Sequence, residues 1–174
     1  MEVDGEKVSI PCVSAIIERI QNGTTEVLIQ TRWKPEFDPI YSGTIEIPAG
    51  LVGEYENVYE TLKREVFEET GLTVIKITPD IQTKKHSVTA KNDEAFSFLP
   101  FCVTQQLKNG KPWLGMVFLC EVESGKEPIA QKEEVRDVHW IAKEELQKIF
   151  KETPEKIFTF QLPTLDYYFN YKVD

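Results

Sequence analysis

The chain of 174 residues is 41% hydrophobic and 28% charged, which fits a single globular domain, residues 1–174, with a substantial core. Its net charge of −9 and pI of about 4.9 argue against a protein that binds duplex nucleic acid, because a negative protein repels the phosphate backbone. No apolar run reaches the ~18–20 residues that a membrane span needs, so we expect no membrane partner.

Strand and helix patterns are mixed along the chain. Strands are expected at residues 8–20, 26–32, 44–47, 73–77, 81–88, 95–107, 113–122 and 135–141, and helices at 58–70, 143–150 and 154–171. Asp93–Glu94 is expected in a polar loop, and a turn around Asn109 makes a hairpin of the strands beside it. Thr153 and Pro154 suit the start of the last helix, which Pro163 interrupts. Because strands and helices do not alternate strictly, we expect an α/β protein whose mixed sheet has helices on both faces.

The cysteines and the first residues bear on the cellular compartment. Cys12, Cys102 and Cys120 lie far apart in apolar stretches and form no CxxC pair. The N-terminal residues are acidic, and no apolar segment follows a basic start as in a secretory signal. We therefore expect reduced cysteines packed in the core of a cytoplasmic protein.

The helix expected at 58–70 has clear boundaries. Asn57 is a typical N-cap, and Glu60 stands three residues later, which is the spacing of a capping box. Gly71 follows the last periodic residue and can adopt the left-handed conformation that ends many helices.

This helix concentrates carboxylates beside its apolar face. At 100° per residue, Glu65, Glu68 and Glu69 share a sector roughly 100° wide. Like charges at this spacing destabilise a helix, and Arg64 can neutralise only part of them. A solvated acidic helix face has the same pattern, but divalent cations with oxygen ligands are the alternative that offsets the repulsion.

The segment before the helix favours the metal hypothesis. A short strand ends at Pro48, and a glycine-containing loop from Gly50 leads to Glu56. Such a loop can present backbone carbonyls and carboxylates to the same metal ions as the helix. Metal ions would also explain how a protein of negative charge could bind a phosphorylated ligand.

The segment from Gly50 to Leu72 resembles the Nudix box, G-x5-E-x7-R-E-U-x-E-E-x-G-U with U aliphatic, at every defined position. The chain is thus similar to MutT-like Nudix hydrolases, without a subfamily assignment. The resemblance implies an α/β/α sandwich around a mixed sheet, with the box as a loop–helix–loop. It also implies Mg²⁺ as cofactor, with Mn²⁺ as a substitute.

The resemblance assigns roles to the residues of the box. Glu65 and Glu69 would be the principal metal ligands, together with the carbonyl of Gly50. Glu68 would bind a further Mg²⁺ or orient a water molecule, and Arg64 would hold the glutamates in place. Glu56 would brace the box from its loop.

Family members often add a glutamate from a late loop, as a base or as a metal ligand. Gln131-Lys132-Glu133-Glu134 is in the matching region of this chain. Glu134 is the first candidate for this role and Glu133 the second, while an ordinary charged loop is the alternative for both.

The activity implied is hydrolysis of a phosphoanhydride bond in a nucleoside diphosphate linked to another group. The substrate would be of the ADP-ribose, nucleotide-sugar or nucleoside-triphosphate type. Arg32 could meet a phosphate, and Glu46 lies in an E-x-P-A-G approach found in ADP-ribose and nucleotide-sugar members. Several aromatic residues could stack a base: Trp33, Phe37, Tyr41, Phe96, Phe98 and Trp113.

Other readings remain open at this point. A Nudix-fold nucleotide-binding or sensor module without catalysis would share the fold, although this box is complete. An isoprenoid diphosphate isomerase would need a catalytic cysteine that we cannot place, and an acidic structural domain would bind no metal. Nudix proteins of this length are often homodimers, so a homodimer is one expected state.

Overall fold

The computed structural model of the protein describes residues 2–88 and 93–171. A mixed sheet forms its centre, in the order β12-β13-β3-β4-β14, with β5 beside β4, β6 beside β3 and β7 beside β13. Only the β13–β3 pair is parallel among the described pairs of this sheet. Its strands are β3 (Ile10–Gln21), β4 (Thr24–Arg32), β5 (Ile45–Glu46), β6 (Ala49–Leu51), β7 (Val74–Thr78), β12 (Cys102–Gln105), β13 (Trp113–Val122) and β14 (Val135–Ala142).

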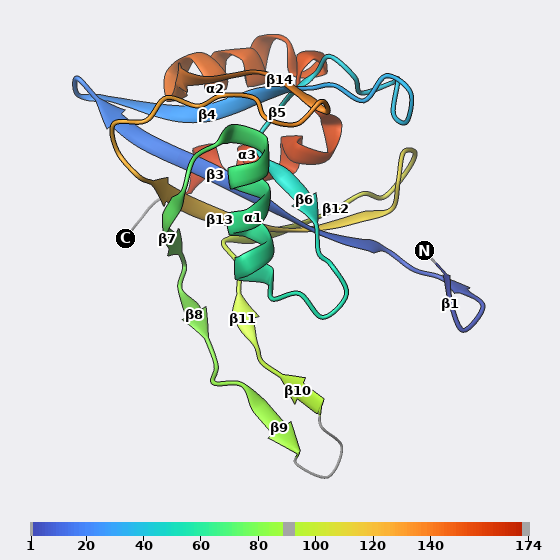
Figure 1. Ribbon diagram of the computed structural model, residues 1–174. Helices are drawn as coiled ribbons and strands as arrows, with labels where there is room; N and C mark the ends of the chain where they lie inside the picture. Colours follow the sequence, from blue (N-terminus) through green and yellow to red (C-terminus); the bar gives the residue numbers. More distant parts are fainter. Residues whose placement is uncertain (1, 89–92, 172–174) are drawn as a thin grey trace.

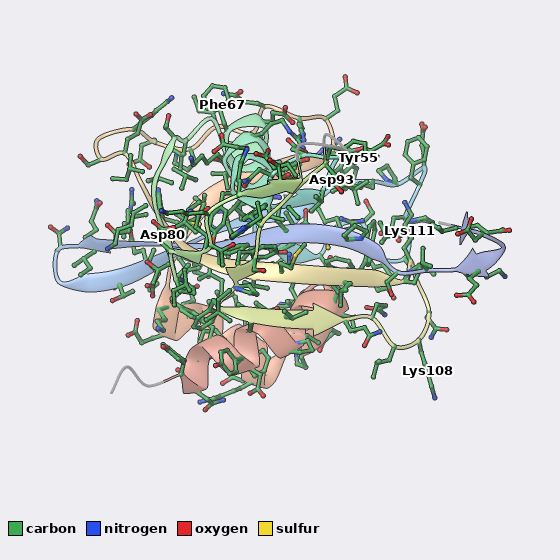
Figure 2. The ribbon with its side chains drawn as sticks, turned by 90° about the horizontal axis from the view of Figure 1, so that it is seen from below. Tyr55, Phe67, Asp80, Asp93, Lys108 and Lys111 are labelled. Atoms are coloured by element: carbon green, nitrogen blue, oxygen red, sulfur yellow. The ribbon has the colours of Figure 1, made fainter. Side chains whose placement is uncertain are left out.

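Helices cover both faces of the sheet, which confirms the predicted α/β/α sandwich. Helix α1 (Val58–Thr70) lies on one face, and α2 (Lys143–Glu152) and α3 (Leu162–Asn170) lie on the other. Figure 2 shows the sheet edge-on between these two layers. In β3, Val13 packs in the cluster of α1 whereas Ile16 packs in the cluster of α2 and α3. Successive side chains of a strand point to opposite faces, so the buried part of β3, residues 12–17, is apolar apart from Ser14.

Asn57 and Gly71 cap α1 as predicted, but the predicted capping box is wrong, because Glu60 pairs with Lys63 and not with Asn57. The Asn57 side chain accepts a hydrogen bond from the backbone N–H of Tyr59 at 2.9 Å. Gly71 has a φ of 72°, and its N–H donates to the carbonyl of Phe67 at 2.8 Å. Glu60 pairs with Lys63 at 3.0 Å, on the exposed side of the helix.

A two-stranded arm projects from the body of the protein (Figure 1). Strand β8 (Ile81–Gln82) pairs with β11 (Phe98–Leu99), and β9 (His86–Val88) pairs with β10 (Asp93–Ala95). The predicted strand at 81–88 is therefore two short strands, and Asp93–Glu94 lies in β10, where a loop was predicted. The predicted strand at 95–107 is divided among β10, β11 and β12. Pro100, which has no N–H for a ladder, lies at the break between β11 and β12.

The ends of the chain also differ from the prediction. A hairpin of β1 (Glu2–Val3) and β2 (Glu6–Lys7) precedes β3. The single helix predicted at 154–171 consists of two 3-10 turns, η1 (Pro154–Lys156) and η2 (Thr159–Gln161), followed by α3. Pro163 lies in the first turn of α3, where its missing N–H costs nothing, so it begins the helix and does not interrupt it. Within residues 2–88 and 93–171, no helix is long and apolar enough to cross a membrane.

Candidate functional site

The loop before α1 is fixed to the sheet at Gly50. Strand β6 pairs with β3 so that Gly50 lies opposite Val13. The side chain of Glu65 lies directly against this glycine, because a Cβ at position 50 would be 1.9 Å from the Glu65 Cδ. Position 50 therefore has to be glycine for Glu65 to reach the sheet.

Arg64 connects the loop with the acidic side of α1. Its guanidinium donates two hydrogen bonds to the carboxylate of Glu56, at 2.8 and 2.9 Å. It also contacts Glu65 at 2.7 Å and Glu68 at 3.3 Å. The hydrogen bonds from Arg64 lower the pKa of Glu56 to about 2, so this carboxylate is ionised at neutral pH. Arg64 and Glu56 thus have the bracing geometry that the sequence predicts.

A lysine from the β13–β14 connection lies between two of the box glutamates. The ammonium of Lys132 is 2.6 Å from Glu65 Oε2 and 2.9 Å from Glu68 Oε2. Glu65 is buried, with 7% of its surface exposed, whereas Glu68 is half exposed. The hydrogen bond from Lys132 keeps the pKa of Glu68 below its usual range. The sequence prediction gave Lys132 no role, since it lies 67 positions from Glu65.

Glu69 faces a row of buried polar groups on β4 and β5. Its Oε2 accepts hydrogen bonds from the Gln30 side chain at 2.9 Å and from the Ala49 N–H at 3.0 Å. The amide nitrogen of Gln30 also donates to Glu46 at 3.2 Å. Burial, reinforced by the negative charge of Glu46, raises the pKa of Glu69 to about 8. Burial also raises the pKa of Glu46, so these two acids resist being ionised together.

Arg32 lies at the end of this row, next to Glu46. It donates to Glu46 at 3.2 Å and makes two hydrogen bonds to Asp38. Its guanidinium carbon lies 4.6 Å from the centre of the Phe158 ring. Burial acts to lower the pKa of Arg32, but the two carboxylates outweigh this effect and raise it. Arg32 is therefore a fixed, permanently charged group.

Part of this set lines a pocket with a volume of about 390 Å³, while Gln30, Glu56, Arg64 and Glu68 are not among the described residues that line it. The lining combines carboxylates, cations and aromatic rings. Its lining is Cys12, Arg32, Lys34, Phe37, Asp38, Glu46, Ala49, Gly50, Leu51, Glu65, Glu69, Lys111, Trp113, Lys132, Glu134, Phe158, Phe160 and Gln161.

The pocket brings together most of the predicted site residues. Trp33 and Tyr41, predicted to bind substrate, are not among the described residues that line it. The Trp33 ring is covered by the guanidinium of Arg136, 3.6 Å from its centre, and Tyr41 packs edge-on against Phe158 at 5.1 Å. Neither ring lines this pocket, although Trp33 lines a surface hollow that shares Lys34 and Glu134 with it.

Glu134 is the late-loop glutamate that reaches the pocket. Its side chain is 49% exposed and pairs with Lys34 at 2.5 Å. The hydrogen bond from Lys34 lowers the pKa of Glu134. Glu133 lines a neighbouring surface hollow with Trp33, outside this pocket. The geometry therefore favours Glu134 over Glu133 as the candidate.

A family model described as the NUDIX domain matches residues 10–161. The chain belongs to the NUDIX family. It is therefore a hydrolase that acts on pyrophosphate bonds. A comparison with curated protein sequences found no match.

Solved structures share the Nudix fold over nearly the whole chain. The NUDIX domain of Shewanella oneidensis NrtR complexed with ADP ribose is 15% identical, with a TM-score of 0.65, covering 95% of this chain and 90% of that one. A MutT NUDIX hydrolase from Burkholderia pseudomallei is 20% identical, with a TM-score of 0.60 and coverage of 92% and 98%. An Ap4A hydrolase binary complex from C. elegans is 18% identical, with a TM-score of 0.57 and coverage of 92% and 96%.

Nudix hydrolases generally use divalent metal ions such as Mg²⁺. In the described part of the chain, no three acidic, histidine or cysteine side chains converge as a ready metal cluster. Glu65 and Glu68 instead share the ammonium of Lys132, which shows that both can bind one cation between them. Carboxylate oxygens are also the donors that Mg²⁺ prefers. The Nudix residues present here therefore fit a divalent cation.

Proposed function

We propose that this Nudix hydrolase is a Mg²⁺-dependent pyrophosphohydrolase, with Mn²⁺ as a substitute, that acts on a nucleoside diphosphate linked to another group. The observation that carries the proposal is that Gly50, Glu65 and Glu69 line the same pocket as Arg32 and Trp113. The glutamates of that pocket suit metal ions, and its cations and aromatic rings suit a phosphorylated, aromatic ligand. Because both helical layers pack on one continuous sheet, we also infer that residues 1–174 form one domain.

We assign metal binding to the box glutamates of α1. Glu65 and Glu69 would be the principal ligands with the Gly50 carbonyl, and Glu68 would be a further ligand. Bound divalent ions would neutralise the charge of the phosphate oxygens and lower the pKa of an attacking water molecule. Arg64 holds Glu65 and Glu68 through its bonds to the Glu56 brace, so the carboxylates are positioned before substrate arrives.

We assign proton transfer to Glu134. Lys34 lowers the pKa of its carboxylate, which is therefore ionised at neutral pH and can accept a proton from water. Its half-exposed position on the pocket lining leaves it free to meet a water molecule, once the ion pair with Lys34 opens.

We assign substrate binding to Arg32 and to the aromatic rings of the pocket. Arg32 is held by Glu46 and Asp38, so its charge is fixed in place for a phosphate. Trp113 and Phe160 offer flat apolar surfaces for a base. The ADP ribose bound to the Shewanella NUDIX domain and the Ap4A named for the C. elegans hydrolase support a nucleotide-containing substrate.

A substrate panel tests the proposal. Nucleoside triphosphates, ADP-ribose, nucleotide sugars and dinucleoside polyphosphates are incubated with Mg²⁺, and phosphate-containing products are measured. We expect turnover of at least one class that is lost in Glu65→Gln and retained in Glu60→Gln, on the exposed side of α1. Binding of a nucleotide without turnover of any class would instead favour a nucleotide-binding module.

A further inference from the structure

The connection from β13 to β14 is anchored to the end of α1. The last carbonyls of a helix have no partner within the helix. Here the N–H of Ile129 donates to the carbonyl of Thr70 at 2.9 Å, and the N–H of Gln131 donates to the carbonyl of Glu69 at 3.3 Å. The Gln131 side chain lies close over Gly71, where a Cβ would be 2.5 Å from its Nε2. The backbone that carries Lys132 is therefore fixed relative to the box.

The side chain of Lys132 occupies the space between two proposed metal ligands. Its ammonium bonds Oε2 of Glu65 at 2.6 Å and Oε2 of Glu68 at 2.9 Å, and its side chain is only 29% exposed. An ammonium group has donors and no acceptor, so it cannot coordinate a metal ion beside these oxygens. Lys132 and a divalent cation would therefore compete for the same carboxylate oxygens.

Arg64 touches the same two glutamates, but its position differs. It is held by Glu56 through two hydrogen bonds. Lys132 has a flexible stem and is held at its tip by Glu65 and Glu68. The lysine is therefore the cation that can leave, while the arginine stays as a brace.

We propose that Lys132 is an internal counter-ion that holds Glu65 and Glu68 together until a divalent metal ion displaces its ammonium, which then turns to a phosphate of the substrate. The inference rests on the proposed function. Because Lys132 also lines the pocket, the displaced ammonium remains beside the space assigned to the diphosphate. Metal and substrate should then strengthen each other's binding, since the substrate offers Lys132 a new anionic partner.

Calorimetric titration of the full chain with Mn²⁺, without substrate, tests this proposal. Lys132→Met removes the competing charge and keeps the length of the side chain. Lys126→Met is the matched control, because Lys126 lies in the same connection but pairs with Glu123 and lies over the Phe67 ring, and forms no ion pair with Glu65 or Glu68. We expect Lys132→Met to bind Mn²⁺ about tenfold more tightly than Lys126→Met, which corresponds to ~1.4 kcal/mol.

The outcomes separate the two proposals. If wild type binds no Mn²⁺, the proposed function fails. If wild type binds Mn²⁺ and Lys132→Met binds it equally or more weakly than Lys126→Met, the counter-ion role is overturned. Lys132→Arg, which keeps the charge, should bind Mn²⁺ with an affinity close to that of wild type. It keeps the proposal testable if Lys132→Met does not fold. Melting curves in excess chelator should show Lys132→Met less stable than Lys126→Met, because the buried Glu65 loses a partner.

Discussion

Gly50 and Glu65 are packed so closely that no larger residue fits at position 50 without moving the glutamate. The Glu65 carboxylate cannot move freely, because Arg64 and Lys132 both bind it. Gly50 of β6 and Glu65 of α1 therefore form one structural unit, although 15 positions separate them in the sequence.

This relationship predicts the effect of Gly50→Ala. The added methyl group overlaps Glu65, and overpacking of this kind costs ~1–3 kcal/mol. We expect a lower free energy of unfolding and loss of turnover. Gly53→Ala is the control, since its Cβ would meet Glu56 less closely, at 2.9 Å from Oε2 and 3.4 Å from Cβ. Equal stability of the two variants in chemical denaturation would contradict the packing argument.

The raised pKa of Glu69 predicts how stability of the metal-free protein depends on pH. The folded state keeps the proton up to about pH 8, whereas an unfolded glutamate releases it near its ordinary value of 4.5. The folded state therefore binds more protons between these values, and stability falls as pH rises through that window. In excess chelator, wild type should lose more stability than Glu69→Gln between pH 5 and pH 8, as measured by urea unfolding. Parallel pH profiles for the two proteins would be evidence against this titration.

Substitution of Glu134 should separate catalysis from folding. Loss of a general base lowers turnover by ~10²–10⁴-fold. The ion pair with Lys34 is partly exposed and contributes only ~0–1 kcal/mol. Glu134→Gln should therefore lose activity at an almost unchanged melting temperature, while Glu133→Gln keeps both. A wild-type rate in Glu134→Gln would move the proton-accepting role elsewhere.

Local signals explain which parts of this site could be predicted. The span and caps of α1 follow from residues within a few positions of each other, and so does the acidic sector that contains Glu65, Glu68 and Glu69. Gln30 could also have been predicted, because it lies two positions from both Leu28 and Arg32 on β4, so the three side chains point to the same face.

The rest of the site depends on contacts that the sequence does not reveal. Lys132 reaches Glu65 across 67 positions, and Phe158 and Phe160 reach the pocket from the turns before α3. Trp33 and Tyr41 were assigned to the substrate because an aromatic ring can stack a base. Whether a ring faces a cavity or supports its rim depends on tertiary packing. The bounds of the arm strands were predicted wrongly for a similar reason, because β9 and β10 form by pairing with each other and the local sequence does not reveal that pairing.

The most direct test of the account is a calorimetric titration of Mn²⁺ into Glu65→Gln/Glu69→Gln, with Glu60→Gln as the control on the same helix. The account predicts normal binding in Glu60→Gln and no measurable binding in the double variant, with both proteins folded by circular dichroism. Equal heats of binding in the two proteins would contradict the claim that the buried carboxylates of α1 hold the metal.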